Sequence, residues 1–519
     1  MINSMSADTV PLTELSRIAA ASDPNREAFA DGKDGRCVTW SEFDTESNQA
    51  ANAFSNYVGQ GDRIAFICDA SVNHVTLWNG GIKAGCVVSN LHVKSSPKTM
   101  RNCIDRLHPS VIVLDEQYSE FFKEEIYDDI TTGVDAVITT GEPQTSYEIE
   151  MSPFLRQRSD QPPDVQIGED EISSVLWTSG TTGKPKGWCL THRSAVMRGM
   201  KLVSALNISR TTRRIQTLSP SFAAWFTGTM PAMLTGSATC FLQDWDPKKY
   251  LNLIEEKEQT MATLVPSMWR EVLNIASFDE YDLGSLERIT AAGERLDATT
   301  LERLESEVCG LVYNAFAATE VMATSLSNKE MDDERVESVG KPAISTEVRI
   351  IEQDGNPTDI MPPNETGEII VKAPDSVAWA WGDTEKTQEA FVDGWWYSGD
   401  LGYQDEDGYI YLEGRSDFMI LSKGIKVYPA PIEEVLNSHP KVAQSAVVGV
   451  EDDEYGEKVT AVVHRADANL TAGELDDWCL KSDNLARFER PREYNFVDKS
   501  LPRTATNKLD RAGVKNSLD

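Results

Sequence analysis

A ten-residue segment rich in glycine and hydroxyl groups, residues 178–187, carries the clearest chemical signal in the chain. It reads TSGTTGKPKG and follows an apolar run at 173–177 that favours a strand. Glycine lets a turn approach a phosphate chain closely, while hydroxyl and N–H groups donate to phosphate oxygens and lysines supply charge. The spacing is not that of the Walker A loop. We predict a nucleotide-phosphate loop formed by Thr178, Ser179, Gly180, Thr181, Thr182, Gly183 and Lys186.

This segment resembles the phosphate loop of the adenylate-forming superfamily, which includes acyl-CoA synthetases, aryl-CoA ligases, peptide synthetase adenylation domains and beetle luciferases. Further motifs similar to those of the family extend from Thr39 to Lys508. The resemblance implies an α/β fold: a large N-terminal domain of doubly wound α/β subdomains plus a β-rich subdomain, followed by a small mobile α+β C-terminal domain. It also implies that the protein is a carboxylic acid–thiol ligase, with ATP and coenzyme A as co-substrates and Mg²⁺ as cofactor.

A second motif, Phe316-Ala317-Ala318-Thr319-Glu320, resembles the family's aromatic-Gly-x-Thr-Glu sequence. The resemblance implies that the Phe316 ring stacks on adenine, that Thr319 contacts the α-phosphate and that Glu320 holds Mg²⁺, for which a carboxylate is a suitable hard ligand. Ala317 replaces the family's glycine where the acid and nucleotide meet. The nearby turn at Gly293 and Glu294 resembles a family turn that packs against the adenine and acyl group.

Two more motifs resemble the ribose site and the hinge of the family. In the sequence Tyr-Ser-Gly-Asp, Asp400 stands where the family's aspartate accepts hydrogen bonds from the ribose hydroxyls, and a carboxylate can accept from a vicinal diol. In Gly-Arg-Ser-Asp, Arg415 is expected to contact the ribose or phosphate, and Asp417 is expected to be the pivot of the hinge.

The last motif resembles the family's closing P-x-T-x-x-G-K sequence and ends at Lys508. The resemblance implies that Lys508 bridges the attacking carboxylate and the α-phosphate, which makes Lys508, Thr319 and Glu320 the expected catalytic residues. A loop with Lys423 and Gly424 is expected to contact the thiol substrate after the C-terminal domain rotates. Pro431 interrupts a neighbouring family motif, and a proline can be accommodated in a first helical turn.

The acid is defined less sharply than the nucleotide. Ala223 replaces a common histidine of the family beside the acyl pocket, and Ala223, Trp225 and Ala317 are our candidates for its lining. An apolar and aromatic lining suits a fatty acid or an aryl acid. No aspartate stands at 223–226 to hold an α-amino group, so an amino acid is disfavoured. The same aromatic residues would also suit a protein core.

The elements that must position these residues can be traced by periodicity. Apolar runs at 64–68, 110–114, 136–138, 173–177, 215–218, 262–265 and 311–313 alternate with helix candidates that end near Lys83 or span 247–258 and 297–306. This alternation predicts parallel sheets covered by helices. Residues 367–413 read as a β-rich subdomain. The pattern after 418, with helices near 431–438, 472–482 and beyond 509 and strands near 442–450 and 459–464, predicts a small α+β domain.

We therefore expect an N-terminal adenylating domain at 1–414, a hinge at 415–417 and a mobile C-terminal domain at 418–519. The formal net charge is −34 over 519 residues, which disfavours nucleic acid as a partner because phosphate binding needs a basic surface. The charge fits either an ordinary soluble surface or adaptation to a salt-rich cytoplasm. We find no secretory signal or membrane span, and eight scattered cysteines form no C-x-x-C pair. A cytoplasmic location fits best, and the oligomeric state is left open.

The predicted function is ATP-dependent activation of a carboxylic acid to acyl-AMP, followed by thioester formation with coenzyme A. A fatty acid is the first candidate and an aryl acid the second. The principal alternative is transfer of the acyl group to a separate carrier protein. A luciferase-like monooxygenase and a silent nucleotide-binding relative are further alternatives, and the full set of motifs argues against the silent relative.

Overall fold

The computed structural model describes residues 11–32, 35–127, 133–156, 158–179, 185–328, 335, 337–452, 454–482, 485–503 and 509–518. The chain divides into two compact units. Unit 1 comprises Met1–Val336, Gly340–Glu347 and Lys372–Trp396, and unit 2 comprises Glu337–Val339, Val348–Val371 and Tyr397–Asp519. The predicted boundary at 415–417 lies inside unit 2, and the hinge stays a prediction.

One sheet of unit 1 has seven strands, in the order β7 (Glu148–Glu150), β6 (Ala136–Thr139), β5 (Val111–Leu114), β3 (Arg63–Ile67), β4 (Val87–Asn90), β8 (Ile172–Ser179) and β9 (Pro185–Thr191). All neighbours are parallel except β8 and β9. Ile64 and Phe66 join one hydrophobic cluster, whereas Ala65 and Ile67 join another. Both faces of this sheet are therefore buried, as expected when helices cover a parallel sheet on both sides.

The other sheet of unit 1 has nine strands, in the order β16 (Lys341–Pro342), β15 (Ser325–Ser327), β14 (Val312–Phe316), β13 (Arg288–Ala292), β12 (Met261–Leu264), β10 (Arg213–Gln216), β11 (Ala238–Phe241), β1 (Glu27–Asp31) and β2 (Cys37–Thr39). From β14 to β1 in this order the strands run parallel to one another, whereas β15 pairs antiparallel with β14 and β2 pairs antiparallel with β1. The chain leaves β10 for β11 on one side and returns to β12 on the other. Strand order therefore reverses at β10, and ligands of open α/β sheets bind beside such a point.

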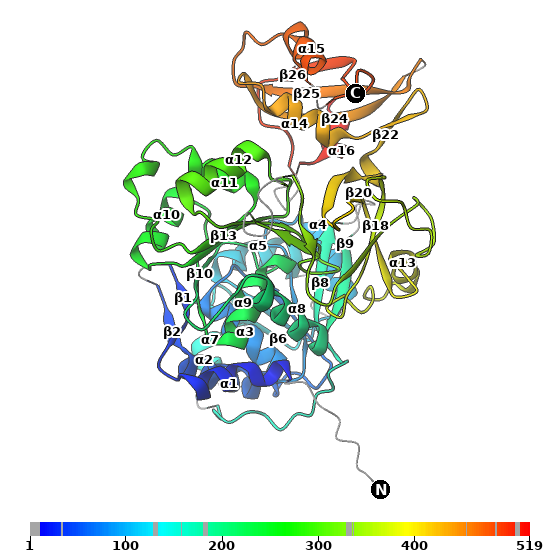
Figure 1. Cartoon of the computed structure of the whole chain (residues 1–519). Helices are drawn as coiled ribbons and strands as arrows, with labels where there is room; N and C mark the ends of the chain where they lie inside the picture. Colours follow the sequence, from blue (N-terminus) through cyan, green and yellow to red (C-terminus); the bar gives the residue numbers. More distant parts are fainter. Residues whose placement is uncertain are drawn as a thin grey trace. The chain divides into compact units, whose positions relative to one another are not determined.

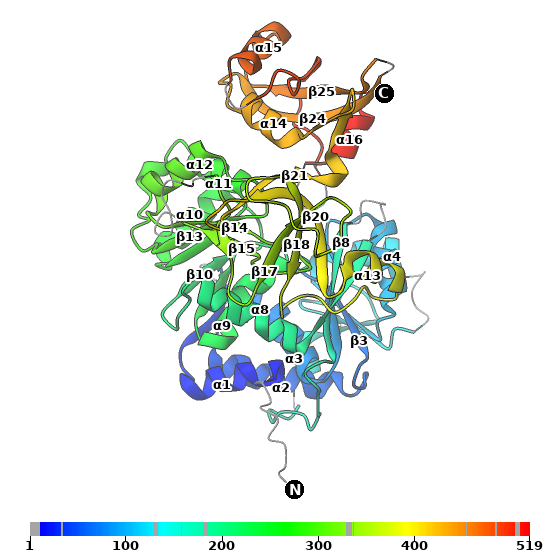
Figure 2. The same ribbon diagram turned by 45° about the vertical axis from the view of Figure 1, so that its right-hand side comes forward.

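Helices pack on both sheets of unit 1, and Figures 1 and 2 show α10, α11 and α12 gathered beside β10 and β13. Side-chain caps explain where several helices begin: Thr39 forms a capping box with Glu42 at the start of α2, and Asp297 accepts a hydrogen bond from Thr300 N at 2.8 Å at the start of α12. The helices are α1 (Leu15–Ser22), α2 (Trp40–Phe54), α3 (Val72–Lys83), α4 (Pro97–Leu107), α5 (Ser119–Phe122), α7 (Met151–Leu155), α8 (His192–Ala205), α9 (Phe226–Thr235), α10 (Pro247–Glu256), α11 (Pro266–Leu273), α12 (Ala298–Arg303) and α13 (Thr384–Ala390).

Two five-stranded sheets complete the structure. The first contains β17 (Glu347–Ile351), β18 (Gly367–Lys372), β20 (Trp395–Gln404) and β19 (Phe391–Val392) in that order, with β21 (Ile410–Arg415) paired to β20. The second contains β23 (Ile425–Val427), β22 (Ile420–Ser422), β25 (Gly456–Arg465) and β24 (Val442–Asp452), with β26 (Glu493–Val497) paired to β25. The second sheet is accompanied by α14 (Pro429–Asn437), α15 (Ala472–Lys481) and α16 (Arg511–Asn516).

The predicted fold class is confirmed: doubly wound α/β sheets, a β-rich region around β18–β21 and a small C-terminal α+β region. Each apolar run named above corresponds to a strand, and the helix predicted near 431–438 begins at Pro429, so Pro431 lies in its first turn. Within the described residues, no helix is both long and apolar enough to cross a membrane.

Candidate active site

The carboxyl ends of four parallel strands bring several predicted site residues to one edge of the nine-stranded sheet. Leu264 pairs with Ala291, and Ala292 pairs with Ala315, so β12, β13 and β14 end at similar heights. Gly293 and Glu294 directly follow β13, and Phe316 ends β14. Ala223 follows β10 after a short connection. This edge is where strand order reverses, which makes it the natural ligand-binding edge of the sheet.

The Phe316–Glu320 segment forms a tight, well-anchored loop. The N–H of Thr324 donates to the Phe316 carbonyl at 2.8 Å, and the N–H of Ala318 donates to the Val321 carbonyl at 3.1 Å. Phe316 is buried, while Thr319 and Glu320 are half-buried. The loop therefore leaves Thr319 and Glu320 accessible on a fixed backbone, which suits groups that must meet a nucleotide.

The predicted phosphate loop joins the antiparallel strands β8 and β9. Thr178 pairs with Lys186, and Ser179 pairs with Pro185. The intervening loop residues lie outside the described residues, as does the catalytic candidate Lys508. The predicted roles of Gly180, Thr181, Thr182, Gly183 and Lys508 therefore stay predictions.

Glu294 has a structural partner at the ligand edge. Its carboxylate accepts hydrogen bonds from the N–H of Ser267 at 3.0 Å and from the Ser267 hydroxyl at 3.1 Å. Ser267 lies in the first turn of α11, where free N–H groups favour a carboxylate. Glu294 thus ties the turn after β13 to α11, and its predicted nucleotide contact stays a prediction.

Trp225 lies in a buried aromatic cluster. Its ring is fully buried and lies 5.1 Å from the Trp78 ring and 5.2 Å from the His74 ring, both edge-on. His74 Nε2 is 2.8 Å from the side-chain oxygen of Asn90, whose amide donates to the Pro220 carbonyl at 3.1 Å. Burial lowers the pKa of His74 to about 4. The cluster holds the connection before α9 through the hydrogen bond to the Pro220 carbonyl. The assignment of Ala223, Trp225 and Ala317 to an acyl pocket stays a prediction.

In unit 2, Arg415 lies between two carboxylates. Its Nη1 is 3.2 Å from Oδ1 of Asp400, and its Nη2 is 3.4 Å from Oδ2 of Asp417. Asp400 and Arg415 are direct neighbours on β20 and β21. Gly399 has a φ of +69°, and a β-carbon there would lie 3.0 Å from Nη2 of Arg415, so this glycine is needed for both its backbone angle and its closeness to the guanidinium. The two residues predicted to contact the ribose are therefore already paired.

The predicted thiol loop is the two-residue turn between β22 and β23. Lys423 and Gly424 have φ angles of +51° and +78°, the left-handed pair that closes a tight hairpin. The Lys423 amine lies 2.6 Å from a carboxylate oxygen of Glu454, which raises the pKa of the lysine. The turn is exposed, and its contact with a thiol stays a prediction.

Glu320 offers a carboxylate of the kind that Mg²⁺ takes from a protein. Within the described residues, no three histidine, cysteine, aspartate or glutamate side chains are grouped as metal ligands. Magnesium commonly takes only one or two carboxylates and completes its shell with waters and substrate phosphates. The half-buried carboxylate of Glu320 is consistent with that pattern.

Sequence reasoning missed a charged cluster beneath the Thr319–Glu320 loop. Arg198 and Lys201 lie on α8 three residues apart, hence on one face, and Asp375 follows β18. All three are buried, and Arg198 donates to the carbonyls of Thr319 at 2.8 Å and Glu320 at 3.2 Å. The signal in the sequence that could have revealed this cluster was the placement of two cationic residues on the buried face of an amphipathic helix.

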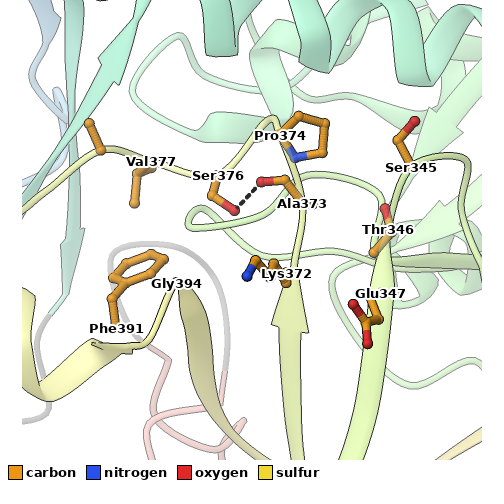
Figure 3. Close-up of a pocket in the computed structure, with 11 residues that line it drawn as sticks. Ser345, Thr346, Glu347, Lys372, Ala373, Pro374, Ser376, Val377, Phe391 and Gly394 are labelled. Atoms are coloured by element: carbon orange, nitrogen blue, oxygen red, sulfur yellow. Dashed lines mark hydrogen bonds between the residues drawn. The ribbon is translucent and has the colours of Figure 1, made fainter. Parts of the chain in front are cut away.

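A separate open pocket of about 750 Å³ lies in unit 1, and its lining contains none of the predicted site residues. Figure 3 shows the Lys372 amine and the Phe391 ring beside it, with Ser376 donating a hydrogen bond to the Ala373 carbonyl at 2.7 Å. The segment from Ala373 to Ala378 forms part of its wall. The same segment reaches the loop described above, because the N–H of Val377 donates to the Glu320 carbonyl at 2.9 Å.

Comparison with known proteins agrees with these motifs. Residues 16–378 match the family described as AMP-binding enzyme, and residues 431–508 match the AMP-binding enzyme C-terminal domain. A feruloyl-CoA synthase of Amycolatopsis is 28% identical over 504 residues, which cover 96% of each chain. A medium/long-chain fatty acid–CoA ligase of Mycobacterium tuberculosis is 31% identical over 367 residues, which cover 69% of this chain and 62% of the relative.

Among solved structures, the o-succinylbenzoate CoA synthetase of Bacillus subtilis, in complex with its acyl-adenylate intermediate, has a TM-score of 0.84 and 25% identity. The match covers 98% of both chains. Sequence, fold and relatives therefore agree along nearly the whole length. The chain belongs to the AMP-binding enzyme family and is an enzyme of its AMP-forming acid–CoA ligase group.

Proposed function

We propose that this enzyme converts an apolar carboxylic acid, ATP and coenzyme A into an acyl-CoA, AMP and pyrophosphate through a bound acyl-adenylate. The observation that carries the proposal is the Phe316–Glu320 loop, which is fixed at the ligand edge of the nine-stranded sheet. The acyl-adenylate bound by the Bacillus relative supports the same assignment. The rest of the proposal assigns roles to the residues of this chain.

In the first half-reaction, a carboxylate oxygen attacks the α-phosphorus of ATP and pyrophosphate leaves. A carboxylate and a triphosphate repel each other, so catalysis depends on positioning and on neutralising charge. Phe316 would hold the adenine, Thr319 the α-phosphate and Lys508 both the acid and the α-phosphate. Mg²⁺, when bound at Glu320, would supply further positive charge to the phosphates.

In the second half-reaction, the thiol of coenzyme A attacks the acyl carbonyl and AMP leaves. Acyl phosphates are good acyl donors because AMP is a far better leaving group than hydroxide. The hairpin turn with Lys423 and Gly424 would contact the thiol substrate after the C-terminal region rotates about Asp417. That rotation would withdraw Lys508, so one site would serve both half-reactions in turn.

The acid is proposed to be a fatty acid or an aryl acid. The two relatives named above act on one of each kind, a feruloyl group and medium or long fatty chains. The surroundings of Trp225, two positions after Ala223, support an apolar acid, since its buried ring packs against the rings of Trp78 and His74. A charged or zwitterionic acid would find no partner in that cluster.

A panel of acids tests the proposal. Pyrophosphate release is measured with acetate, octanoate, palmitate, benzoate and ferulate, each with and without coenzyme A. Release with one apolar acid, together with its acyl-CoA when coenzyme A is present, is the expected result. Release without any acyl-CoA would instead indicate a carrier protein as the acceptor, and absence of release with every acid would contradict the proposed function.

A further inference from the structure

The helix α8 carries two cations into the interior of unit 1. Arg198 is fully buried and the Lys201 side chain is 3% exposed. Removing such groups from water is costly and is tolerated only where partners compensate. Burial lowers the pKa of both side chains, while the neighbouring charge of Asp375 opposes that effect in each case. Two positions on the buried face of α8 therefore carry charged side chains where apolar side chains would usually pack.

Asp375 joins these cations to the loop. Its Oδ1 lies 2.5 Å from the Lys201 amine, its Oδ2 accepts from the Met322 N–H at 3.1 Å, and its carbonyl accepts from Nε of Arg198 at 3.0 Å. The side chain of Asp375 is fully buried, although residues on both sides of it, Pro374 and Ser376, line the open pocket (Figure 3). Asp375 is thus buried between two residues that line the open pocket.

The side chains of this cluster make their hydrogen bonds mainly to the backbone of residues 319–322. Arg198 donates to the carbonyls of Thr319 and Glu320, and Lys201 donates to the Met322 carbonyl at 3.0 Å. With the Met322 N–H bond to Asp375 and the Val377 N–H bond to Glu320, five hydrogen bonds fix this short stretch. The Glu320 carbonyl is therefore held from two sides, by the Arg198 guanidinium and by the Val377 N–H.

The segment 375–381 also reaches the strand that follows the phosphate loop. The N–H of Ala378 donates to the Cys189 carbonyl at 2.8 Å, and the N–H of Trp381 donates to the Gly187 carbonyl at 2.7 Å. Arg106 donates to the carbonyls of Pro185 and, at 3.1 Å, Trp381. One segment therefore connects β9, immediately after the phosphate loop, to the Glu320 backbone.

Stability alone does not account for this arrangement. A buried ion pair can often be replaced by apolar groups of similar volume without loss of stability. The two cations instead donate to the carbonyls of Thr319, Glu320 and Met322, in the loop that carries the Mg²⁺ candidate. The charge of Glu320 also favours the buried Arg198 cation. This placement of Arg198 and Lys201 is what we expect if the loop that carries Glu320 must be held in one position.

We propose that Asp375 and Lys201 are positioning residues for the metal–nucleotide site: their ion pair, together with Arg198, sets where the Glu320 carboxylate meets the metal-bound triphosphate. The inference rests on the proposed function, because it assumes that Glu320 serves ATP with Mg²⁺. Neither Asp375 nor Lys201 is assigned a contact with substrate. Their effect passes through the backbone of residues 319–322.

The test measures ATP binding by calorimetry as a function of Mg²⁺ concentration, without any acid or coenzyme A. Asp375→Asn keeps an acceptor for the Met322 N–H but removes the charge that pairs with Lys201. We expect it to raise the Mg²⁺ concentration for half-maximal ATP binding about tenfold, a typical coupling for groups in one network. In a Glu320→Gln background, the same substitution should add less than about twofold, because its effect passes through Glu320.

A matched control is available in the same unit. Lys83 and Asp44 form a buried lysine–aspartate pair at 2.6 Å between α3 and α2, with side chains 3% and 13% exposed. Asp44→Asn should lower the unfolding temperature as Asp375→Asn does, yet leave the Mg²⁺ dependence unchanged. Lys201→Arg, which keeps the charge, should stay near the wild-type Mg²⁺ dependence. If Asp375→Asn fails to fold, the neutral pair Asp375→Asn/Lys201→Met replaces it, with the same tenfold expectation.

Two results would overturn the inference. One is a wild-type Mg²⁺ dependence in the folded Asp375 variant or in the neutral pair. The other is an equal shift of the Mg²⁺ concentration for half-maximal ATP binding with and without the Glu320 carboxylate, because the effect would then not depend on that carboxylate. Failure of the wild-type enzyme to bind ATP at any Mg²⁺ concentration would be a different outcome, because it would overturn the proposed function and the inference with it.

Discussion

Nη1 of Arg415 lies 3.2 Å from Oδ1 of Asp400, and the two residues face each other across β20 and β21. Asp400 is held further by the hydrogen bond that its N–H donates to the Ser398 hydroxyl at 2.9 Å. The Asp400 side chain is 17% exposed and that of Arg415 is 40% exposed. The pair therefore presents a fixed carboxylate, a group that can accept hydrogen bonds from the hydroxyls of a diol.

Replacing Asp400 by asparagine should weaken ATP binding. Loss of a hydrogen bond to a charged group typically costs about 1.5–3 kcal/mol, which corresponds to roughly a tenfold to hundredfold higher KM for ATP. The rate of pyrophosphate release at saturating ATP should fall less. Asp405→Asn is a suitable control, because Asp405 lies at the far turn of the same hairpin and accepts the Tyr409 N–H at 2.8 Å. An unchanged KM in Asp400→Asn would remove this residue from the ribose site.

Replacing Lys508 by alanine should separate the two half-reactions. We expect acyl-AMP formation to fall by at least about a hundredfold, because Lys508 is the proposed cation on the attacking acid and the α-phosphate. Thioester formation from a supplied acyl-adenylate should stay within about threefold of wild type. Equal loss of both half-reactions would contradict the proposed rotation of the C-terminal region.

Replacing Gly424 in the hairpin turn should affect the second half-reaction and spare the first. Gly424 has a φ of +78°, so Gly424→Ala imposes about 1–2 kcal/mol of backbone strain, although its β-carbon would meet no atom within 4 Å. Thioester formation should slow while acyl-AMP formation is unaffected. Gly408→Ala is the matched control, since Gly408 has a φ of +86° in the β20–β21 turn. Slowing of acyl-AMP formation by Gly424→Ala, or equal slowing of thioester formation by both variants, would exclude a specific role for this turn.

The buried His74 should make stability depend on pH. Its pKa is lowered from 6.5 to about 4 by burial, so the folded state binds this proton less tightly than the unfolded state. The stability that this group contributes is present above pH 6.5 and is lost as the pH falls toward 4. The difference corresponds to about 3 kcal/mol. His74→Gln should remove that part of the slope in denaturant unfolding between pH 6.5 and 4.5, and an unaltered slope would contradict the assignment.

Much of the fold could be predicted because its strands are short, apolar and regularly separated by helices. The runs at 64–68 and 110–114 appear as β3 and β5, and the phosphate-loop sequence at 178–187 spans the end of β8 and the start of β9. Strand order could not be predicted, since the pairing of β14 with β13 and the reversal at β10 depend on tertiary packing. The antiparallel strand β9 was also not predicted, because its residues read as part of the loop motif.

The candidate site was predictable where a short motif carries the chemistry, and not where a role depends on distant neighbours. Phe316, Glu320, Asp400 and Arg415 all stand in such motifs. Asp375 does not, because its significance comes from Lys201, which is 174 positions away and reached only in the folded chain. Trp225 also depends on a distant neighbour: its ring is fully buried and packs against Trp78, and its assignment to the acyl pocket stays a prediction.

The central claim is that the enzyme makes an acyl-adenylate and passes its acyl group to coenzyme A. The most direct measurement incubates excess enzyme with ATP, Mg²⁺ and the preferred acid, without coenzyme A, and identifies the bound product by mass spectrometry before and after a coenzyme A chase. The account predicts stoichiometric acyl-AMP before the chase, and its conversion to acyl-CoA and AMP afterwards. Formation of acyl-CoA with ADP and phosphate, or persistence of acyl-AMP through the chase, would contradict it.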